Sequence, residues 1–253
     1  MPIEDAVVSG FAVLRVQQLD DRVVVELNRP QVRNAINAEM VAELHEVCAE
    51  LERAPKILIV TGTGTDFAAG ADIAELRERG RDEALAGINR AVFDRVAGLP
   101  MPTIAAVEGN ALGGGAELAY ACDLRVAGSG ARFGNPEVGL GIVASAGANY
   151  RLAELVGKSV AKQVILGGRI LDADAALQYG LVAEVVASGA ALAAAGALAD
   201  RIGKSSALAL RLSKAILDAA NPHPLLDDLA QAVLFESADK KERMTRFLEK
   251  RSS

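Results

Sequence analysis

Residues 104–141 read IAAVEGNALGGGAELAYACDLRVAGSGARFGNPEVGLG, and this stretch decides the fold class. The apolar run within 102–109 predicts a strand, the glycines at 113–115 open a predicted small-residue helix over 113–123, and residues 124–128 return to a strand. A strand, a loop, a helix and a further strand in this order are typical of a right-handed α/β path. The stretch therefore predicts an α/β fold.

The flanking sequence extends this pattern in both directions. Upstream, the apolar pattern predicts three strands and two helices, at 11–19, 22–28, 38–52, 56–62 and 73–98. From about residue 145 the chain is expected to be mostly helical, with its last four helices at 188–202, 205–219, 225–235 and 238–250. No linker is long enough to separate independent domains. We therefore expect an α/β core followed by helices.

The composition argues against several classes of protein. The chain has 253 residues, 51% of them hydrophobic and 24% charged, which is ordinary for a globular protein. A formal charge of −6 with no stripe of Lys or Arg argues against nucleic acid as a partner. No apolar run reaches the ~20 residues that a membrane span needs, and the N-terminus lacks the apolar segment of a secretory signal. We expect a cytoplasmic protein.

The cysteines and histidines predict no metal site. Cys48 and Cys122 lie far apart without metal-ligand spacing, so we expect two reduced, buried thiols. His45 lies within a predicted helix, and His223 stands between two prolines. Two histidines in such settings do not indicate a histidine-based triad or a metal centre.

Three segments place backbone amides or a carboxylate directly after a strand: FAAGAD at 67–72, the glycine turn at 113–115, and the loop that follows Pro136. The first amides of a helix have no partner within the helix, so those at 113–115 suit an oxygen that becomes negative during a reaction. Glu117 lies in the same first turn, and Glu137 lies in the third segment. Taken singly, a glycine turn is often only a tight connection, and such a glutamate is often a surface group.

Taken together, these segments resemble the signature of the crotonase superfamily, particularly its enoyl-CoA hydratases. Three further stretches carry the resemblance across nearly the whole chain: NRPQVRNAIN at 28–37, GRILDADAALQYGLVAEVV at 168–186 and RMTRFLEKR at 243–251. The first segment, read as FAAGADI at 67–73, matches the family as well. The resemblance implies a crotonase-like ββα spiral core with the acyl-CoA site at 1–195. It also implies a C-terminal helical trimerisation region at 196–253, and hence a homotrimer or a hexamer built as a dimer of trimers.

The resemblance also implies a role for individual residues. The N–H groups of Ala71 and Gly114 would form an oxyanion hole for the thioester oxygen. Glu117 would position and deprotonate a water molecule, and Glu137 would supply a proton to the α-carbon. The remaining implied contacts are with coenzyme A: Arg29, Ala68, Ala69, Gly70, Asp72 and Ile73 in one chain, with Phe247 and Lys250 reaching in from a neighbouring subunit.

The function implied is that of a 2-trans-enoyl-CoA hydratase, which adds water syn to give 3-hydroxyacyl-CoA, as in fatty acid β-oxidation, without a metal or redox cofactor. The alternatives are another crotonase reaction, chiefly Δ3,Δ2-enoyl-CoA isomerisation, and a non-catalytic acyl-CoA-binding protein. Isomerisation needs only one acid/base, so the presence of both Glu117 and Glu137 favours hydration. The sequence departs from many family hydratases at ASAGANYRL, residues 144–152, and at Ala74, where some carry a lysine.

Overall fold

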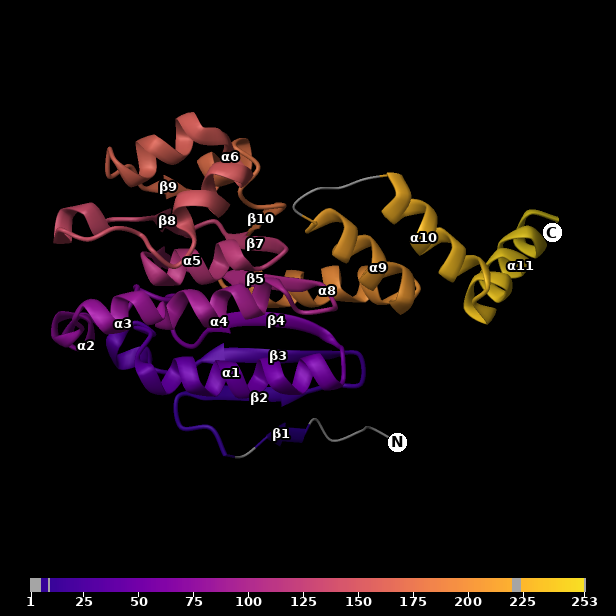
Figure 1. The fold of residues 1–253 in the computed structure, drawn as a ribbon, viewed down its shortest axis with the longest axis horizontal. Coiled ribbons are helices and arrows are strands. Elements are labelled where there is room, and N and C mark those ends of the chain that lie inside the picture. The colour runs from indigo at the N-terminus through magenta and orange to yellow at the C-terminus, as the bar shows by residue number, and fades with distance from the viewer. Residues whose placement is uncertain (1–5, 9, 220–223, 253) are drawn as a thin grey trace.

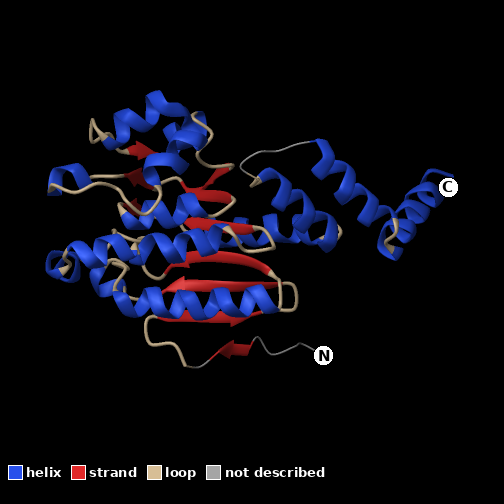
Figure 2. Cartoon of the chain, viewed as in Figure 1, coloured by secondary structure: helices blue, strands red, loops and turns tan. Residues whose placement is uncertain are grey.

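The computed structural model describes residues 6–8, 10–219 and 224–252, and its centre is a seven-stranded sheet (Figure 2). The strands lie in the order β1-β2-β3-β4-β5-β7-β10, and every pair from β3 onward is parallel. Their bounds are Ala6–Val8 for β1, Leu14–Gln18 for β2, Arg22–Leu27 for β3, Ile57–Gly62 for β4, Thr103–Val107 for β5, Leu124–Gly128 for β7 and Glu184–Val186 for β10. β4 and β5 are almost continuously apolar because helices cover both faces of the parallel part of the sheet.

Alternate residues of β4 enter two different cores. Leu58 and Val60 pack with α1 (Ala38–Arg53), α4 (Ile88–Ala97) and α5 (Gly114–Ala121). Ile57 and Ile59 point the other way, toward α8 (Ala191–Gly203). α8 presents three fully buried alanines at four-residue spacing, Ala191, Ala195 and Ala199. Their small side chains let the helix lie close to the sheet.

A second, three-stranded sheet lies beside the glycine turn. It consists of β6 (Asn110–Leu112), β8 (Arg132–Gly134) and β9 (Leu171–Asp172), with β8 in the middle. The N–H of Gly113 donates to the carbonyl of Gly134 at 2.8 Å, which ties the start of α5 to the end of β8. This sheet therefore brings the segment that follows Gly134 up to the glycine turn.

The remaining helices are α2 (Ile73–Glu78), α3 (Arg81–Ala86), α6 (Ala148–Ile165), α7 (Ala173–Gln178), α9 (Ala207–Leu217), α10 (Pro224–Phe235) and α11 (Ala238–Ser252), with 3-10 turns at Pro30–Val32 and Glu137–Leu140. In Figure 1, α10 and α11 extend away from the sheet, at the opposite end of the molecule from α2 and α3. No helix in the described part of the chain is long and apolar enough to cross a membrane.

The predicted α/β class, with helices at the C-terminus, is confirmed. One local prediction was wrong. The single helix expected over 73–98 is three helices, because the chain breaks at Gly80 and again at Gly87, whose φ of 61° is left-handed. The region after residue 145 is mostly helical, as predicted, and it also supplies the short strands β9 and β10. A division between residues 195 and 196 would fall within α8, and the two-region division stays a prediction.

Candidate active site

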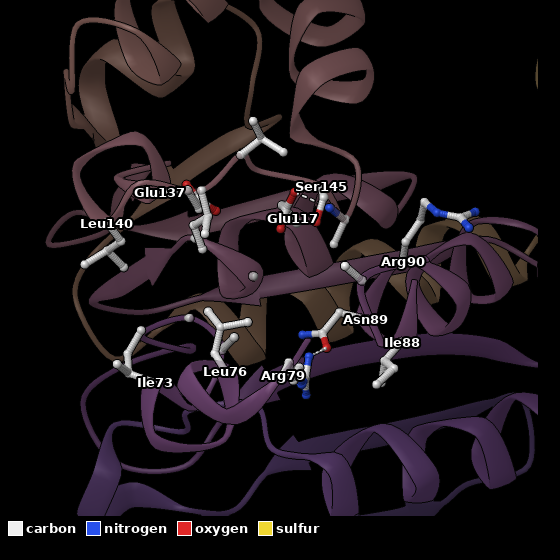
Figure 3. A pocket seen from close by; sticks show the side chains of 18 of the residues that line it. Ile73, Leu76, Arg79, Ile88, Asn89, Arg90, Glu117, Glu137, Leu140 and Ser145 are labelled. Atoms are coloured by element: carbon white, nitrogen blue, oxygen red, sulfur yellow. Dashed lines mark hydrogen bonds between the residues drawn. The ribbon is translucent and has the colours of Figure 1, made fainter. Parts of the chain in front are cut away.

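A cavity of about 730 Å³ opens between α2, α3 and the start of α4 on one side and residues 136–146 on the other (Figure 3). The turn at 69–71 and the start of α5 complete its wall. Three of the segments singled out in the sequence therefore meet at one cavity. Glu117 and Glu137 lie on one side of it, and Arg79 and Asn89 on the other.

Two backbone N–H groups are available at the cavity wall. Ile36 donates to the carbonyl of Gly70, and Asp72 donates to the carbonyl of Ile36, so the intervening Ala71 N–H faces the other way. Within the described residues, neither Ala71 N–H nor Gly114 N–H has an acceptor. A Cβ placed on Gly114 would lie 3.4 Å from the Ala71 nitrogen, so the two groups are neighbours. Paired unengaged amides can stabilise an oxyanion.

The glycines on either side of Gly114 are required by the backbone and by close contacts. Gly113 has φ 51° and ψ −126°, which side chains disfavour, and its Cβ would approach Oε1 of Glu137 to 3.3 Å. A Cβ on Gly115 would lie 2.2 Å from the carbonyl oxygen of Ala68. The turn therefore keeps α5 tight against residues 68–71, with its first amides next to Ala71.

Glu117 is a buried carboxylate held by two backbone amides. Its Oε1 accepts the N–H of Ala146 at 2.8 Å and that of Ala148 at 3.1 Å. Burial raises the pKa of Glu117 to about 7, and the nearby charge of Glu137 adds to the rise, while the amides of Ala148 and Ala146 oppose it. The two N–H bonds favour the ionised form of this carboxyl over a neutral one in the same place.

Glu137 is also buried, but it has a different set of partners. Its Oε1 accepts Nδ2 of Asn135 at 3.4 Å, and Asn135 in turn accepts the hydroxyl of Tyr120 at 3.2 Å. Its Oε2 is buried with no hydrogen-bond partner among the described residues. Burial raises the pKa of Glu137. A buried carboxyl oxygen without a donor is better accommodated as a protonated acid than as an anion.

The two carboxyls form an electrostatically coupled pair. Each raised pKa has burial as its largest cause, and the charge of Glu137 further raises the pKa of Glu117. Such a pair holds one proton over a range of pH, because ionising both carboxyls places two negative charges in a buried site. The N–H groups of Ala146 and Ala148 can support a negative charge on Glu117, and the unpartnered Oε2 of Glu137 suits a protonated acid, whereas the rise in the pKa of Glu117 to about 7 lets Glu117 also hold the shared proton. The two carboxyls can therefore supply a base and an acid.

The unusual segment at 144–152 builds the support of Glu117. It contributes the Ala146 and Ala148 amides, and Arg151 donates to the carbonyl of Ala146 at 3.3 Å. Arg151 and Tyr150 both donate to Oδ1 of Asp94 on α4, at 2.6 and 3.0 Å. Tyr150, which departs from the family pattern, and Arg151, which matches it, therefore both fasten this segment to α4.

The predicted coenzyme A residues lie in different parts of the structure, and only some of them line the cavity. Ala69, Gly70 and Ile73 line the cavity. Ala68 is fully buried, and its carbonyl accepts the N–H of Leu112 at 3.0 Å.

Arg29 and Asp72 pair with one another at 3.0 Å. Arg29 also donates to the carbonyl of Ala35, and Asp72 caps α2 by accepting the N–H of Ala74. The Arg29–Asp72 ion pair therefore holds the turn that carries Ala71 in place. A contact of these residues with coenzyme A stays a prediction.

Phe247 lies on α11 and is exposed, and the side chain of Lys250 lies outside the described part of the structure. In Figure 1, α11 lies at the opposite end of the chain from α2 and α3, which line the cavity. The expected contact of Phe247 and Lys250 with coenzyme A was with the site of a neighbouring subunit. Their roles stay predictions.

Sequence reasoning missed Arg79 and Asn89. Arg79 Nη1 donates to Oδ1 of Asn89 at 3.1 Å, and both residues line the cavity. They fall inside the polar stretch that predicted a single helix over 73–98. The break at Gly80 and Gly87 turns Arg79 back toward α4, and no sequence signal marks this pairing.

Comparisons with known proteins agree with the fold. The family model described as enoyl-CoA hydratase/isomerase matches residues 22–253. A short-chain-enoyl-CoA hydratase of Clostridium acetobutylicum is 41% identical over 244 residues, which cover 90% of this chain and 91% of that protein. A crotonyl-CoA hydratase of Syntrophomonas wolfei is 41% identical over 243 residues, covering 91% and 92%. The crystal structure of an enoyl-CoA hydratase from Bacillus anthracis superimposes with a TM-score of 0.90 at 31% identity, covering 94% of this chain and 97% of that one.

Proposed function

Because the chain belongs to the enoyl-CoA hydratase/isomerase family, as its resemblance to the crotonase superfamily predicted, we propose that it is an enoyl-CoA hydratase. It adds water syn across the double bond of a 2-trans-enoyl-CoA to give a 3-hydroxyacyl-CoA, as in fatty acid β-oxidation. One observation carries the proposal. Two buried glutamates face one cavity, Glu117 with two backbone N–H groups on its Oε1 and Glu137 with an Oε2 that has no hydrogen-bond partner among the described residues.

The thioester oxygen of the substrate lies between the N–H groups of Ala71 and Gly114. A water molecule lies against Glu117, which takes one of its protons as the water oxygen forms a bond to the β-carbon. The π electrons move toward the thioester oxygen, where the two amides stabilise the enolate charge. Glu137 then gives its proton to the α-carbon, and the thioester carbonyl re-forms.

One water molecule is consumed and no electron is gained or lost. A proton passes from Glu117 back to Glu137 to reset the pair. The mechanism draws its acid and base from these two side chains, so it includes neither a metal nor a redox cofactor.

The apolar side chains on the cavity wall suit an acyl chain. Ile73, Leu76 and Ile88 come from the helices on one side, and Leu140 and Ile142 from the opposite loop. We propose further that the chain acts in the cytoplasm as a homotrimer or a dimer of trimers. The apolar residues exposed on α10, including Leu229 and Val233, support an assembly of this kind.

A hydration assay tests the proposal. The purified protein is given enoyl-CoA substrates from crotonyl-CoA to long chains, and loss of the enoyl-thioester absorbance is followed. We expect hydration, with 3-hydroxyacyl-CoA as the product. A protein that interconverts 3-enoyl-CoA and 2-enoyl-CoA without hydrating either, or that binds acyl-CoA without turnover, would contradict the proposal.

A further inference from the structure

Asn89 presents an amide to the cavity in a fixed orientation. It stands at the start of α4, its side chain is buried, and Arg79 donates to its Oδ1 at 3.1 Å (Figure 3). A guanidinium group can donate hydrogen bonds but cannot accept them. The oxygen of the Asn89 amide must therefore face Arg79, and the NH₂ group must face away from it.

The NH₂ group of Asn89 lies beside the two backbone donors. A Cβ built on Gly114 would be 3.7 Å from Asn89 Nδ2 and 3.4 Å from the Ala71 nitrogen. The Ala71 nitrogen and Asn89 Nδ2 therefore both lie beside Gly114, at one small region of the cavity wall. In the part of the chain that the structure describes, Asn89 Nδ2 donates to no protein acceptor. It is thus available to a bound molecule.

We propose that Asn89 is a third donor to the thioester oxygen of the substrate and that Arg79 is its positioning residue. This inference rests on the proposed function, because it assigns a further group to the same reaction. As the enolate forms, the thioester oxygen gains negative charge, and the Asn89 N–H bonds it more strongly than in the ground state. Arg79 holds the amide in place before the reaction and contributes a positive charge behind it.

The simplest alternative is that the Arg79–Asn89 hydrogen bond only holds the segment after α2 against α4. The two roles use different atoms of Asn89. The structural role needs only Oδ1 of Asn89, whereas the proposed donor is Nδ2 of Asn89. Asn89→Asp keeps an oxygen for Arg79 and adds an ion pair, but it removes the N–H donor. Asn89→Ala removes both.

The matched control is Gln163→Ala. Arg169 donates to Oε1 of Gln163 at 2.6 Å, which is the same kind of arginine–amide pair on the exposed surface of α6. Its loss removes an equivalent hydrogen bond away from the cavity. We expect the control to keep the wild-type rate.

Two measurements test the proposal on the full-length protein. The first is kcat and KM for crotonyl-CoA. Removing one donor from an oxyanion hole lowers kcat by ~10²-fold or more. Because both backbone donors remain when the Asn89 donor is removed, we expect kcat to fall by about 10- to 100-fold in both Asn89 variants. KM should change much less.

The second measurement is the absorption of bound 4-dimethylaminocinnamoyl-CoA, which shifts to longer wavelength as its thioester carbonyl is polarised. We expect a smaller shift in both Asn89 variants than in wild type and in Gln163→Ala. This readout needs no turnover, so it tests Asn89 even if the hydratase assignment fails. Asn89→Asp with an unchanged kcat and an unchanged shift would overturn the proposal. So would a lower kcat with an unchanged shift, because the carbonyl would then not be the group that Asn89 contacts.

Discussion

Replacing Glu117 with glutamine should stabilise the fold at alkaline pH while it damages catalysis. Burial raises the pKa of Glu117 in the folded protein to about 7, above the ordinary value of 4.5. The folded protein therefore binds this proton more tightly than the unfolded chain, and stability falls as the pH rises from 4.5 to about 7 and then levels off. Below pH 4.5 the burial of Glu117 does not lower the free energy of unfolding through ionisation, because its carboxyl is protonated in both the folded and the unfolded state.

The size of the effect follows from that difference. Each pKa unit corresponds to about 1.4 kcal/mol, so ionised Glu117 lowers the free energy of unfolding by about 3 kcal/mol above pH 7. Glutamine cannot ionise, and its Oε1 can still accept the N–H groups of Ala146 and Ala148. We expect a net gain of about 1 to 3 kcal/mol at pH 9, which is several degrees in the unfolding midpoint for a chain of this size.

Thermal unfolding of wild type and Glu117→Gln at pH 5 and pH 9 measures this effect. The gain of the variant over wild type should be small at pH 5 and several degrees at pH 9. Glu154→Gln, a change of an exposed glutamate on α6, is the matched control and should show no such difference. An equal effect of Glu117→Gln at both pH values, or a loss of stability at pH 9, would show that ionised Glu117 does not destabilise the fold.

Three further predictions concern the turn, the pH profile and the assembly. Gly114 has no positive φ, and a Cβ there would lie 3.4 Å from the Ala71 nitrogen, so Gly114→Val should fold, which circular dichroism can check. The variant should lose about 3 kcal/mol of transition-state stabilisation, which is roughly a hundredfold in rate. An unchanged rate in a folded variant would exclude Gly114 from the oxyanion hole. The hydration rate should rise as the pH increases through about 7, because Glu117 then ionises and can act as the base, and a rate independent of pH from 5 to 9 would contradict this role. Light scattering at micromolar concentration should give the mass of a trimer or a hexamer, and a monomer would show that the apolar residues on α10 serve another purpose.

The sequence predicted those elements whose local pattern agrees with their place in the fold. β5, β7 and α5 follow from the apolar runs and the glycine turn within residues 104–141. Glu117 and Glu137 were found because the family signature marks both positions, and the structure places both at one cavity. Their roles as base and acid still await the kinetic tests.

The elements that the sequence did not predict depend on tertiary contacts. β10 is only three residues long and is a strand because it pairs with β7. The two amides that hold Glu117 belong to Ala146 and Ala148, whose side chains carry no chemical signal. Arg79 and Asn89 meet only because the chain breaks between α2, α3 and α4. The amides of Ala146 and Ala148 and the Arg79–Asn89 pair form through contacts between distant segments, which residue type and spacing do not mark.

In the proposed mechanism, Glu117 and Glu137 are the base and the acid of a hydration reaction. The most direct test is the turnover of crotonyl-CoA by Glu117→Gln and by Glu137→Gln, measured together with the binding of butyryl-CoA, which has no double bond to hydrate. We predict that each variant loses at least ~10²-fold in kcat while its affinity for butyryl-CoA stays close to that of wild type, because backbone amides hold the thioester. Near-wild-type turnover by either variant would contradict the account.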